Sequence, residues 1–485
     1  MLVKDDTIAA IATPHGVGGI GIVRVSGPDA EEICRILFKP AAGTDSLKTH
    51  HLYHGDIISP ETGSIIDEVL LALMRKPHSY TGEDTLEINC HGGHLILQTV
   101  LDEVIKAGAR PAEPGEFTKR AYLNGRLDLS QAEAVMDLIT ARTDRGRAIA
   151  LSGLKGNLSE KLQSIRSSLI EILTVLESSI DFTEEDISSK PHRNISKDVE
   201  DVIISINDIL STYKEGRLFR DGLNVVITGK PNVGKSSLLN RLLGERRAIV
   251  TSIPGTTRDF IEETINIGGI PVKLTDTAGV RKSAETIEKE GIEFVWEKAL
   301  AADMVIILID GNTRFTDEDF EVINRNRNKR IVLAINKSDL PHKITNAEIN
   351  DIIPDVEPLW ISAKYGDGIS ELKEKILIPD VEPLWISAKY GDGISELKEK
   401  ICSLASDSGE HMASDIILTN LRHKNALEKT AKLLAAAKDN ISHETSPELA
   451  AFDIRDALDH LGDIAGETTN EDVLDRIFSN FCIGK

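Results

Sequence analysis

The chain has 485 residues, of which 41% are hydrophobic and 28% charged, and a formal net charge of −22 at pH 7. This length predicts about three domains with separate cores. The strongly negative charge argues against a protein that grips long nucleic acid by itself, because such proteins usually carry a basic face. Any role on RNA is therefore expected to be local or shared with a basic partner.

The hydropathy pattern and the cysteines predict a cytoplasmic protein. No apolar run reaches the roughly 18 residues of a membrane span, and residues 1–6 do not resemble a signal peptide. Cys34, Cys90, Cys402 and Cys482 lie far apart without a C-x-x-C pair. This spacing favours free thiols in a reducing compartment over a disulfide framework or a zinc site.

Residues 1 to about 120 are predicted to be rich in β-strands. Strands are expected at residues 7–13, 19–26, 67–74 and 85–89. Glycines between and within the first two strands are followed by a strand instead of a helix, so they do not indicate a dinucleotide site. Arg24, in mid-strand, is either a solvated surface residue or an anion ligand.

Helical patterns begin near residue 130 and return near the end of the chain. Ser130-Gln131-Ala132-Glu133 is a predicted capping box, and a long helix follows, with apolar residues every three or four positions. Its apolar face consists of Leu154, Leu158, Leu162, Ile165, Leu169, Ile172, Leu176 and Ile180. Further amphipathic helices are predicted at 421–437, 452–462 and 472–481. We expect the two helical groups to pack together, with an α/β segment inserted between them.

The α/β segment begins with a phosphate-binding loop at residues 229–236, Gly-Lys-Pro-Asn-Val-Gly-Lys-Ser, which fits G-x-x-x-x-G-K-[ST]. A β-branched apolar run precedes it and a helical run follows it, as the motif requires. The glycines let the backbone wrap a polyphosphate. Lys235 neutralises phosphate charge, and Ser236 is the expected Mg²⁺ ligand.

Further motifs follow in the order typical of a GTPase. Residues 251–259 and 276–279 are expected near the phosphates and Mg²⁺. In Asn336-Lys337-Ser338-Asp339 the carboxylate can accept both N–H groups of guanine's edge, and Ser362-Ala363-Lys364, or its twin at 387–389, closes the base pocket. The candidate nucleotide-binding residues are Asn232, Val233, Gly234, Lys235, Ser236, Ser237, Thr251, Ser252, Ile253, Pro254, Gly255, Thr256, Thr257, Asp276, Thr277, Ala278, Gly279, Asn336, Lys337, Asp339, Ser362, Ala363 and Lys364.

Hydrolysis needs a group that orients water, and the residue after Asp-Thr-Ala-Gly is Val280, which cannot do so. A positive charge must also offset the transition state. The candidates in the two loops are Arg258, Arg281, Glu285, Glu288 and Glu290. A bound monovalent cation is a further possibility.

An exact repeat complicates the base pocket. Residues 353–376 recur unchanged as 378–401, an offset of 378 − 353 = 25. Two identical units do not build a solenoid, so this is a recent tandem duplication or an error in the sequence. Ser362 follows Asn336 by 362 − 336 = 26 residues, a normal gap for one helix, whereas Ser387 follows it by 51. We therefore assign the first copy to guanine.

With these motifs, the whole chain resembles the family of tRNA-modification GTPases named MnmE or TrmE. Besides the GTPase motifs, the likeness rests on residues 6–9, 18–27, 81–84, 91–93, 114–117, 123–129 and 481–485. The resemblance implies a multidomain α+β and α/β protein. Its parts are a β-rich folate-binding and dimerisation domain (1–124), a helical domain (125–218 and 403–485) and an inserted Ras-like P-loop GTPase domain (219–402).

The resemblance also implies ligands and roles for particular residues. A 5-formyl- or 5,10-methylene-tetrahydrofolate would contact Arg24, Glu87, Arg126 and Lys485, although the family usually has Lys where this chain has Arg126. K⁺ would be held by Asn232, Thr251, Ile253 and Thr256, in place of an arginine finger, and Mg²⁺ by Ser236 and Thr257. The implied catalytic residues are Glu288, which positions water, Lys235 and Thr257.

The partners implied are a second copy of the chain, tRNA and the FAD-dependent protein MnmG (GidA), with which the family modifies C5 of the wobble uridine of certain tRNAs. The role of Cys482 stays open between a part in this chemistry and a plain terminal thiol. The alternative function is a regulatory GTP-binding module of the ribosome-assembly type, without folate chemistry. The first 130 residues and 481–485 argue against that alternative.

Overall fold

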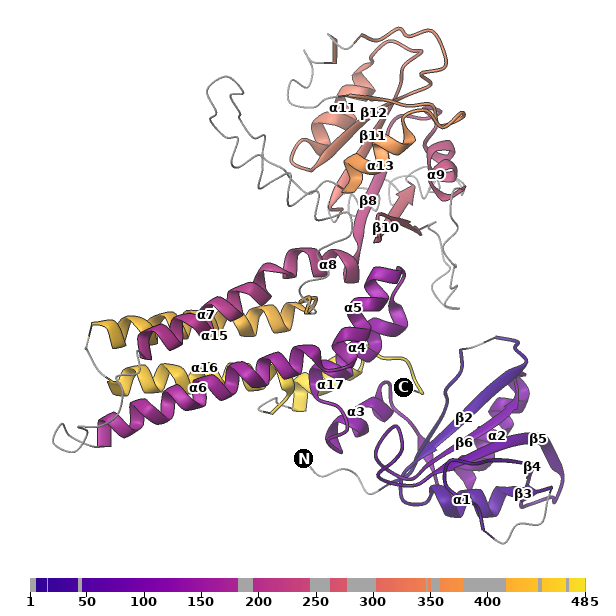
Figure 1. The fold of residues 1–485 in the computed structure, drawn as a ribbon. Helices are drawn as coiled ribbons and strands as arrows, with labels where there is room; N and C mark the ends of the chain where they lie inside the picture. Colours follow the sequence, from indigo (N-terminus) through magenta and orange to yellow (C-terminus); the bar gives the residue numbers. More distant parts are fainter. Residues whose placement is uncertain are drawn as a thin grey trace. The chain divides into compact units, whose positions relative to one another are not determined.

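The computed structural model describes residues 6–14, 16–41, 46–181, 195–244, 262–276, 302–345, 348–349, 358–377, 416–443, 447–467 and 471–484, with the backbone alone at 179–181, 244, 262, 276 and 377. The chain divides into two compact units (Figure 1). The first contains residues 1–139, 150–210 and 421–485, and the second contains residues 140–149 and 211–420.

The described residues of the first unit include a seven-stranded sheet of order β3-β4-β5-β6-β2-β1-β7. Neighbouring strands pair antiparallel, except that β1 and β7 are parallel. The strands are β1 (Ile8–Ile11), β2 (Ile20–Ser26), β3 (Phe38–Pro40), β4 (Leu52–Ile58), β5 (Ile65–Met74), β6 (Thr85–His91) and β7 (Arg110–Pro111). Alternate side chains of β5 are buried, because successive residues of a strand point to opposite faces. Helices α1 (Ala30–Leu37) and α2 (His94–Lys106) contribute to the same core.

The remainder of the first unit is helical. Its helices are α3 (Glu116–Leu123), α4 (Leu129–Thr140), part of α5 (Asp144–Leu154), α6 (Asn157–Asp181), α7 (Ile195–Ser211), α15 (Leu421–Ser442), α16 (Pro447–Ala465) and α17 (Glu471–Phe478). Helix α16 packs against both α6 and α15, and an ion pair between Lys438 and Glu200 joins α15 to α7. Helices from before and after the α/β segment therefore form one bundle. None of the described helices is long and apolar enough to cross a membrane.

Five residues of the predicted apolar face are buried in α6, namely Leu162, Ile165, Leu169, Ile172 and Leu176, but two local predictions were wrong. The capping box forms between Asp128 and Gln131: the Asp128 carboxylate accepts the Gln131 N–H (2.8 Å), and Gln131 Oε1 accepts the Asp128 N–H (3.0 Å). Ser130 already lies inside the first turn of α4. The long helix is interrupted at Gly156, whose φ of 89° ends a helical turn, so Leu154 belongs to α5.

The second unit contains a six-stranded sheet, counted over its described residues, of order β13-β12-β11-β8-β10-β9. Neighbours are parallel except β9 and β10. The strands are β8 (Leu223–Thr228), β9 (Glu262–Ile267), β10 (Ile270–Asp276), β11 (Met304–Asp310), β12 (Ile331–Asn336) and β13 (Leu359–Trp360). Strand β11 is buried along its whole length, as a parallel strand covered on both faces must be.

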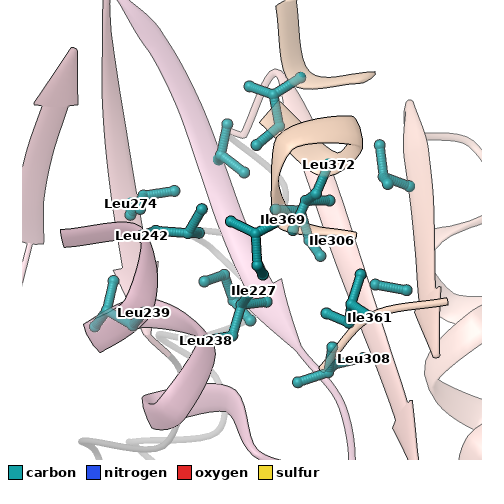
Figure 2. Close-up of a cluster of buried hydrophobic side chains, with 14 of the residues drawn as sticks. Ile227, Leu238, Leu239, Leu242, Leu274, Ile306, Leu308, Ile361, Ile369 and Leu372 are labelled. Atoms are coloured by element: carbon teal, nitrogen blue, oxygen red, sulfur yellow. The ribbon is translucent and has the colours of Figure 1, made fainter. Parts of the chain in front are cut away.

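Helices cover both faces of this sheet. Helices α9 (Lys235–Gly244) and α13 (Ile369–Leu377) pack on one face (Figure 2), and α11 (Asp317–Asn326) packs on the other. The residues labelled in Figure 2 are Ile227, Leu238, Leu239, Leu242, Leu274, Ile306, Leu308, Ile361, Ile369 and Leu372. In such open α/β sheets, ligands bind outside the carboxyl ends of the parallel strands. The loops after β8, β11 and β12 lie at that edge.

Candidate functional site

The loop between β8 and α9 is wrapped around the ammonium of Lys235. Lys235 Nζ donates hydrogen bonds to the carbonyl oxygens of Gly229 and Lys230, each at 2.9 Å. A Cβ on Gly229 would lie 2.3 Å from the Leu308 carbonyl oxygen, so only glycine fits there. Asn232 lies exposed in the loop, with a left-handed φ of 64°. The arrangement leaves the start of α9 open to bind an anion.

Asn336, at the end of β12, links this loop to the segment after β13. Its Nδ2 donates to the Val233 carbonyl oxygen (2.7 Å), and its Oδ1 accepts the Ala363 N–H (2.9 Å). The side chain is almost completely buried. One amide therefore fixes the spacing between the phosphate loop and the predicted base pocket.

Lys337 and Asp339, both predicted to bind the nucleotide, have different partners in the structure. Lys337 has a φ of 66°, and its Nζ lies 2.5 Å from Asp310 Oδ2 at the end of β11. Asp339 is exposed, and its Oδ1 accepts a hydrogen bond from the Ser362 hydroxyl at 2.7 Å. Within the described part of the chain, Asp339 Oδ2 has no hydrogen-bond partner. It can accept N–H groups from a ligand.

A second ion pair joins the phosphate loop to helix α11. Lys230 Nζ lies 2.8 Å from Asp319 Oδ2, and the Asp319 side chain is only 2% exposed. The same oxygen accepts the N–H and the hydroxyl of Thr316, which form the capping box at the start of α11. The sequence analysis missed this pair. The signal available was the spacing Thr-x-x-Asp before a helix, which predicts the cap but not the lysine.

The structure describes only part of the predicted nucleotide site. Residues 229–237, 336–339 and 362–364 are brought together around the carboxyl edge of the sheet. The predicted residues that lie outside the described positions are Thr251, Ser252, Ile253, Pro254, Gly255, Thr256, Thr257, the Asp276 side chain, Thr277, Ala278, Gly279, Glu288 and the second-copy triplet 387–389. No cluster of three or more His, Cys, Asp or Glu ligands suited to a metal occurs among the described residues.

Arg24 and Glu87 form a second candidate site, on the sheet of the first unit. They lie opposite each other on β2 and β6, and Arg24 Nε and Nη2 both contact Glu87 Oε1, at 2.9 and 2.8 Å. The Arg24 side chain is 14% exposed. Its guanidinium carbon lies 5.5 Å from the centre of the Tyr80 ring. Arg24 is therefore a half-buried, paired cation and not a solvated surface residue.

Arg126 lies on the same tyrosine. Its Nη1 donates to the Tyr80 carbonyl oxygen at 2.6 Å, and its guanidinium carbon lies 5.2 Å from the ring centre. Beside them is an open hollow of about 560 Å³, lined by His50, Met74, Pro77, His78, Ser79, Tyr80 and Arg126. Two of the four residues predicted for folate, Arg24 and Arg126, thus meet at one aromatic ring, and a third, Glu87, pairs with Arg24. The hollow itself was not predicted from the sequence.

The carboxyl end of the chain contacts Arg24, a residue of this candidate folate site. The Gly115 N–H donates to the Cys482 carbonyl oxygen (3.4 Å), and Arg24 Nη1 donates to the Gly484 carbonyl oxygen (3.3 Å). Gly484 has a φ of 94°, and a Cβ there would lie 2.6 Å from the Ile11 carbonyl oxygen. Lys485, the fourth residue predicted for folate, lies outside the described residues.

Buried charges also occur within the helices of the first unit. Glu133 of α4 lies 2.8 Å from Arg422 Nη2 and 2.7 Å from His423 Nε2, both on α15. Burial by itself would raise the pKa of Glu133, but hydrogen bonds and charge attraction from His423 and Arg422 outweigh it and lower that pKa to about 2. This cluster ties a helix before the α/β segment to one after it.

Comparisons with known proteins cover the entire chain. The family model of the MnmE helical domain matches residues 129–482, and that of the GTP-binding protein TrmE N-terminus matches residues 7–126. A curated tRNA modification GTPase MnmE from Syntrophus aciditrophicus (strain SB) is 51% identical over 480 residues, with 99% of each chain covered. One from Natranaerobius thermophilus is 42% identical over 481 residues, covering 99% of this chain and 100% of the relative. Among solved structures, the G domain of the T. maritima FeoB iron transporter is 27% identical, with a TM-score of 0.26, covering 32% of this chain and 96% of that one.

Proposed function

The chain belongs to the MnmE family of tRNA modification GTPases, and from this premise we propose that it modifies C5 of the wobble uridine of certain tRNAs, with K⁺, Mg²⁺ and a tetrahydrofolate. The coarser activity, GTP hydrolysis in tRNA modification, follows from family membership. The finer assignment is a cytoplasmic homodimer that works with the FAD-dependent protein MnmG. Its net charge of −22 supports a grip on tRNA that is shared with such a partner.

Guanine recognition is assigned to Asp339 together with Ser362, Ala363 and Lys364, which belong to the first copy of the repeat. The hydrogen bond from Ser362 to Asp339 Oδ1 supports this, because it leaves Oδ2 to accept guanine's N–H groups. Lys235 and the α9 N-terminus are assigned to the phosphates, and the exposed Ser236 hydroxyl, with Thr257, to Mg²⁺. The metal would neutralise charge on the phosphates.

The proposed K⁺ site uses the Asn232 side chain with the carbonyls of Thr251, Ile253 and Thr256. Asn232 is exposed in the phosphate loop, and its side chain has no hydrogen-bond partner within the described part of the chain. A neutral amide oxygen suits a hard cation. The cation would supply the positive charge that another protein's arginine provides elsewhere, while Glu288 positions the attacking water.

The observation that carries the folate site is the convergence of Arg24 and Arg126 on the Tyr80 ring, with Glu87 paired to Arg24. Glu87 is bound by Arg24 through Oε1 alone, so its Oε2 can accept N–H groups from the pyrimidine edge of a pteridine. Within the described part of the chain, the Arg126 guanidinium donates only through Nη1. Its other N–H groups suit the carboxylates at the other end of a folate. These residues fit the ligand, which would supply the one-carbon unit.

A titration of 5-formyl-tetrahydrofolate into the full-length protein tests this assignment. The parent should bind, and Glu87→Gln should weaken binding about tenfold or more, the scale of a lost hydrogen bond to a charged group. Glu68→Gln is the matched control, because Glu68 lies on the same sheet but is exposed and pairs with His54. A parent that does not bind folate would favour the alternative, a GTP-binding module without folate chemistry.

A further inference from the structure

The proposed folate contacts account for only part of the lining of the hollow beside Tyr80. Its volume of about 560 Å³ falls within the usual range for ligand pockets, about 300 to 1,000 Å³. Arg126 and Tyr80 belong both to this hollow and to the proposed folate contacts. His50, Met74, Pro77 and His78 line the part that no contact explains.

Arg126 brings a positive charge to the hollow. Among the described residues, no carboxylate lies within ion-pair distance of Arg126, and its guanidinium donates one hydrogen bond there, to the Tyr80 carbonyl. The side chains of Lys76 and His78 are exposed and have no partner in the described part of the chain.

The acidic groups next to this rim are already engaged. Glu83 accepts the Ser26 hydroxyl (2.8 Å) and Arg120 Nη1 (3.1 Å). Asp84 Oδ1 accepts the backbone N–H of Lys76 (2.8 Å). The side chains left to donate hydrogen bonds to a carboxylate in the hollow are therefore Arg126, His50 and His78, beside the apolar Met74 and Pro77.

We propose that this hollow binds the γ-linked glutamate tail of the folate, and that the protein prefers polyglutamyl over monoglutamyl tetrahydrofolate. The inference rests on the proposed folate function. The pteridine end offers N–H donors, which need an acceptor such as Glu87, whereas each glutamate of the tail adds one carboxylate. Arg24, the partner of Glu87, and Arg126, which lines the hollow, both lie against the Tyr80 ring. A single ligand that contacts Glu87 can therefore extend past Tyr80 toward Arg126 and His78.

The experiment compares the affinities of the full-length protein for monoglutamyl and tri-γ-glutamyl 5-formyl-tetrahydrofolate by titration calorimetry. The parent should bind the triglutamate about tenfold more tightly, since two extra carboxylates meet cationic donors. His78→Gln should reduce this advantage and leave monoglutamate binding unchanged, because His78 lies outside the assigned folate contacts. Arg126→Gln should abolish the advantage. Arg35→Gln is the control, since Arg35 is an exposed arginine of α1 in the same unit, and thermal unfolding checks that each variant folds.

The outcomes separate the two claims. Equal affinity of the parent for both forms would overturn the tail subsite and leave the folate site standing. Binding of neither form would overturn both. A triglutamate advantage that survives in both Arg126→Gln and His78→Gln would place the tail elsewhere and also overturn the inference.

Discussion

Ser362 donates its hydroxyl hydrogen to the Asp339 carboxylate at 2.7 Å, and the same Ser362 oxygen accepts the Tyr365 N–H at 3.2 Å. Ser362 is completely buried. The first of two identical 24-residue segments, 353–376, is thus bound to the carboxylate expected to select guanine. The repeat itself supplies a control, because Ser387 has the same sequence surroundings.

Replacing these two serines should have unequal effects. Ser362→Ala removes a hydrogen bond to a charged group and should weaken GDP binding about tenfold or more. Ser387→Ala should leave the affinity unchanged. Titration of each variant with a fluorescent GDP analogue measures both constants. A larger loss in Ser387→Ala would assign guanine to the second copy.

The parts of the fold that follow local rules could be predicted from the sequence, and those that depend on distant partners could not. The strand at 223–228, the phosphate loop and the stripe of α6 each follow from a short pattern. Strand β4 was not predicted, because its exposed and half-buried residues show weak alternation. A capping box was predicted at Ser130 because Ser-x-x-Glu fits the pattern, but Glu133 is instead buried against Arg422.

The same division holds for the sites. The motif residues of the nucleotide site are predicted from the chemical type that each position needs, and their roles stay predictions. The Lys230–Asp319 pair and the hollow at Tyr80 join segments that are far apart in the sequence, and no spacing rule connects them. The contact of Gly484 with Arg24 spans 460 residues. Only the resemblance to a family predicted that the end of the chain, through Lys485, would share a site with Arg24.

Breaking the Lys230–Asp319 pair should loosen the phosphate loop. Asp319→Asn leaves a nearly buried ammonium without its counter-charge, which costs on the order of 3 kcal/mol of folding stability. Because the Lys230 carbonyl also holds Lys235, GTP affinity should fall about tenfold. Urea unfolding and nucleotide titration measure the two effects. Glu321→Gln is the control on the same helix, since Glu321 forms an exposed pair with Arg325. Equal behaviour of the two variants would contradict a link to the loop.

The cation response tests the role of Asn232. We expect K⁺ to stimulate GTP hydrolysis and Na⁺ to do so poorly, because Val280 cannot orient water and a positive charge is still required. The left-handed backbone at Asn232 makes glycine the appropriate replacement, since it removes the amide without strain. Asn232→Gly should lose the K⁺ response and retain GDP binding. Equal hydrolysis rates of the parent in the two salts would rule out the K⁺ site.

The Glu133 cluster predicts a pH dependence of stability. Its pKa is lowered from an ordinary 4.5 to about 2 in the folded protein. A lowered carboxyl pKa stabilises the fold above the unfolded pKa, and this contribution is lost as the pH falls toward the folded pKa. The stability difference between the parent and Glu133→Gln should therefore be constant from pH 7 to about 5 and shrink below about pH 4.5. Urea midpoints across this range measure it, and a difference that grows with acidity would contradict the prediction.

Deleting residues 482–485 tests whether the carboxyl tail completes the folate site. The tail is held by hydrogen bonds from Gly115 and Arg24. Its loss would remove Lys485 and the acceptor of Arg24 Nη1, while Arg24 keeps its pair with Glu87. We expect weaker tetrahydrofolate binding and loss of tRNA modification. GTP hydrolysis should stay near normal, because the tail and the phosphate loop belong to different units. Lys485→Met tests the lysine charge separately from the hydrogen bonds that hold the tail. It should weaken folate binding less than the deletion does, since Gly484 still contacts Arg24. An unchanged folate affinity in the truncated protein would refute a role for the tail.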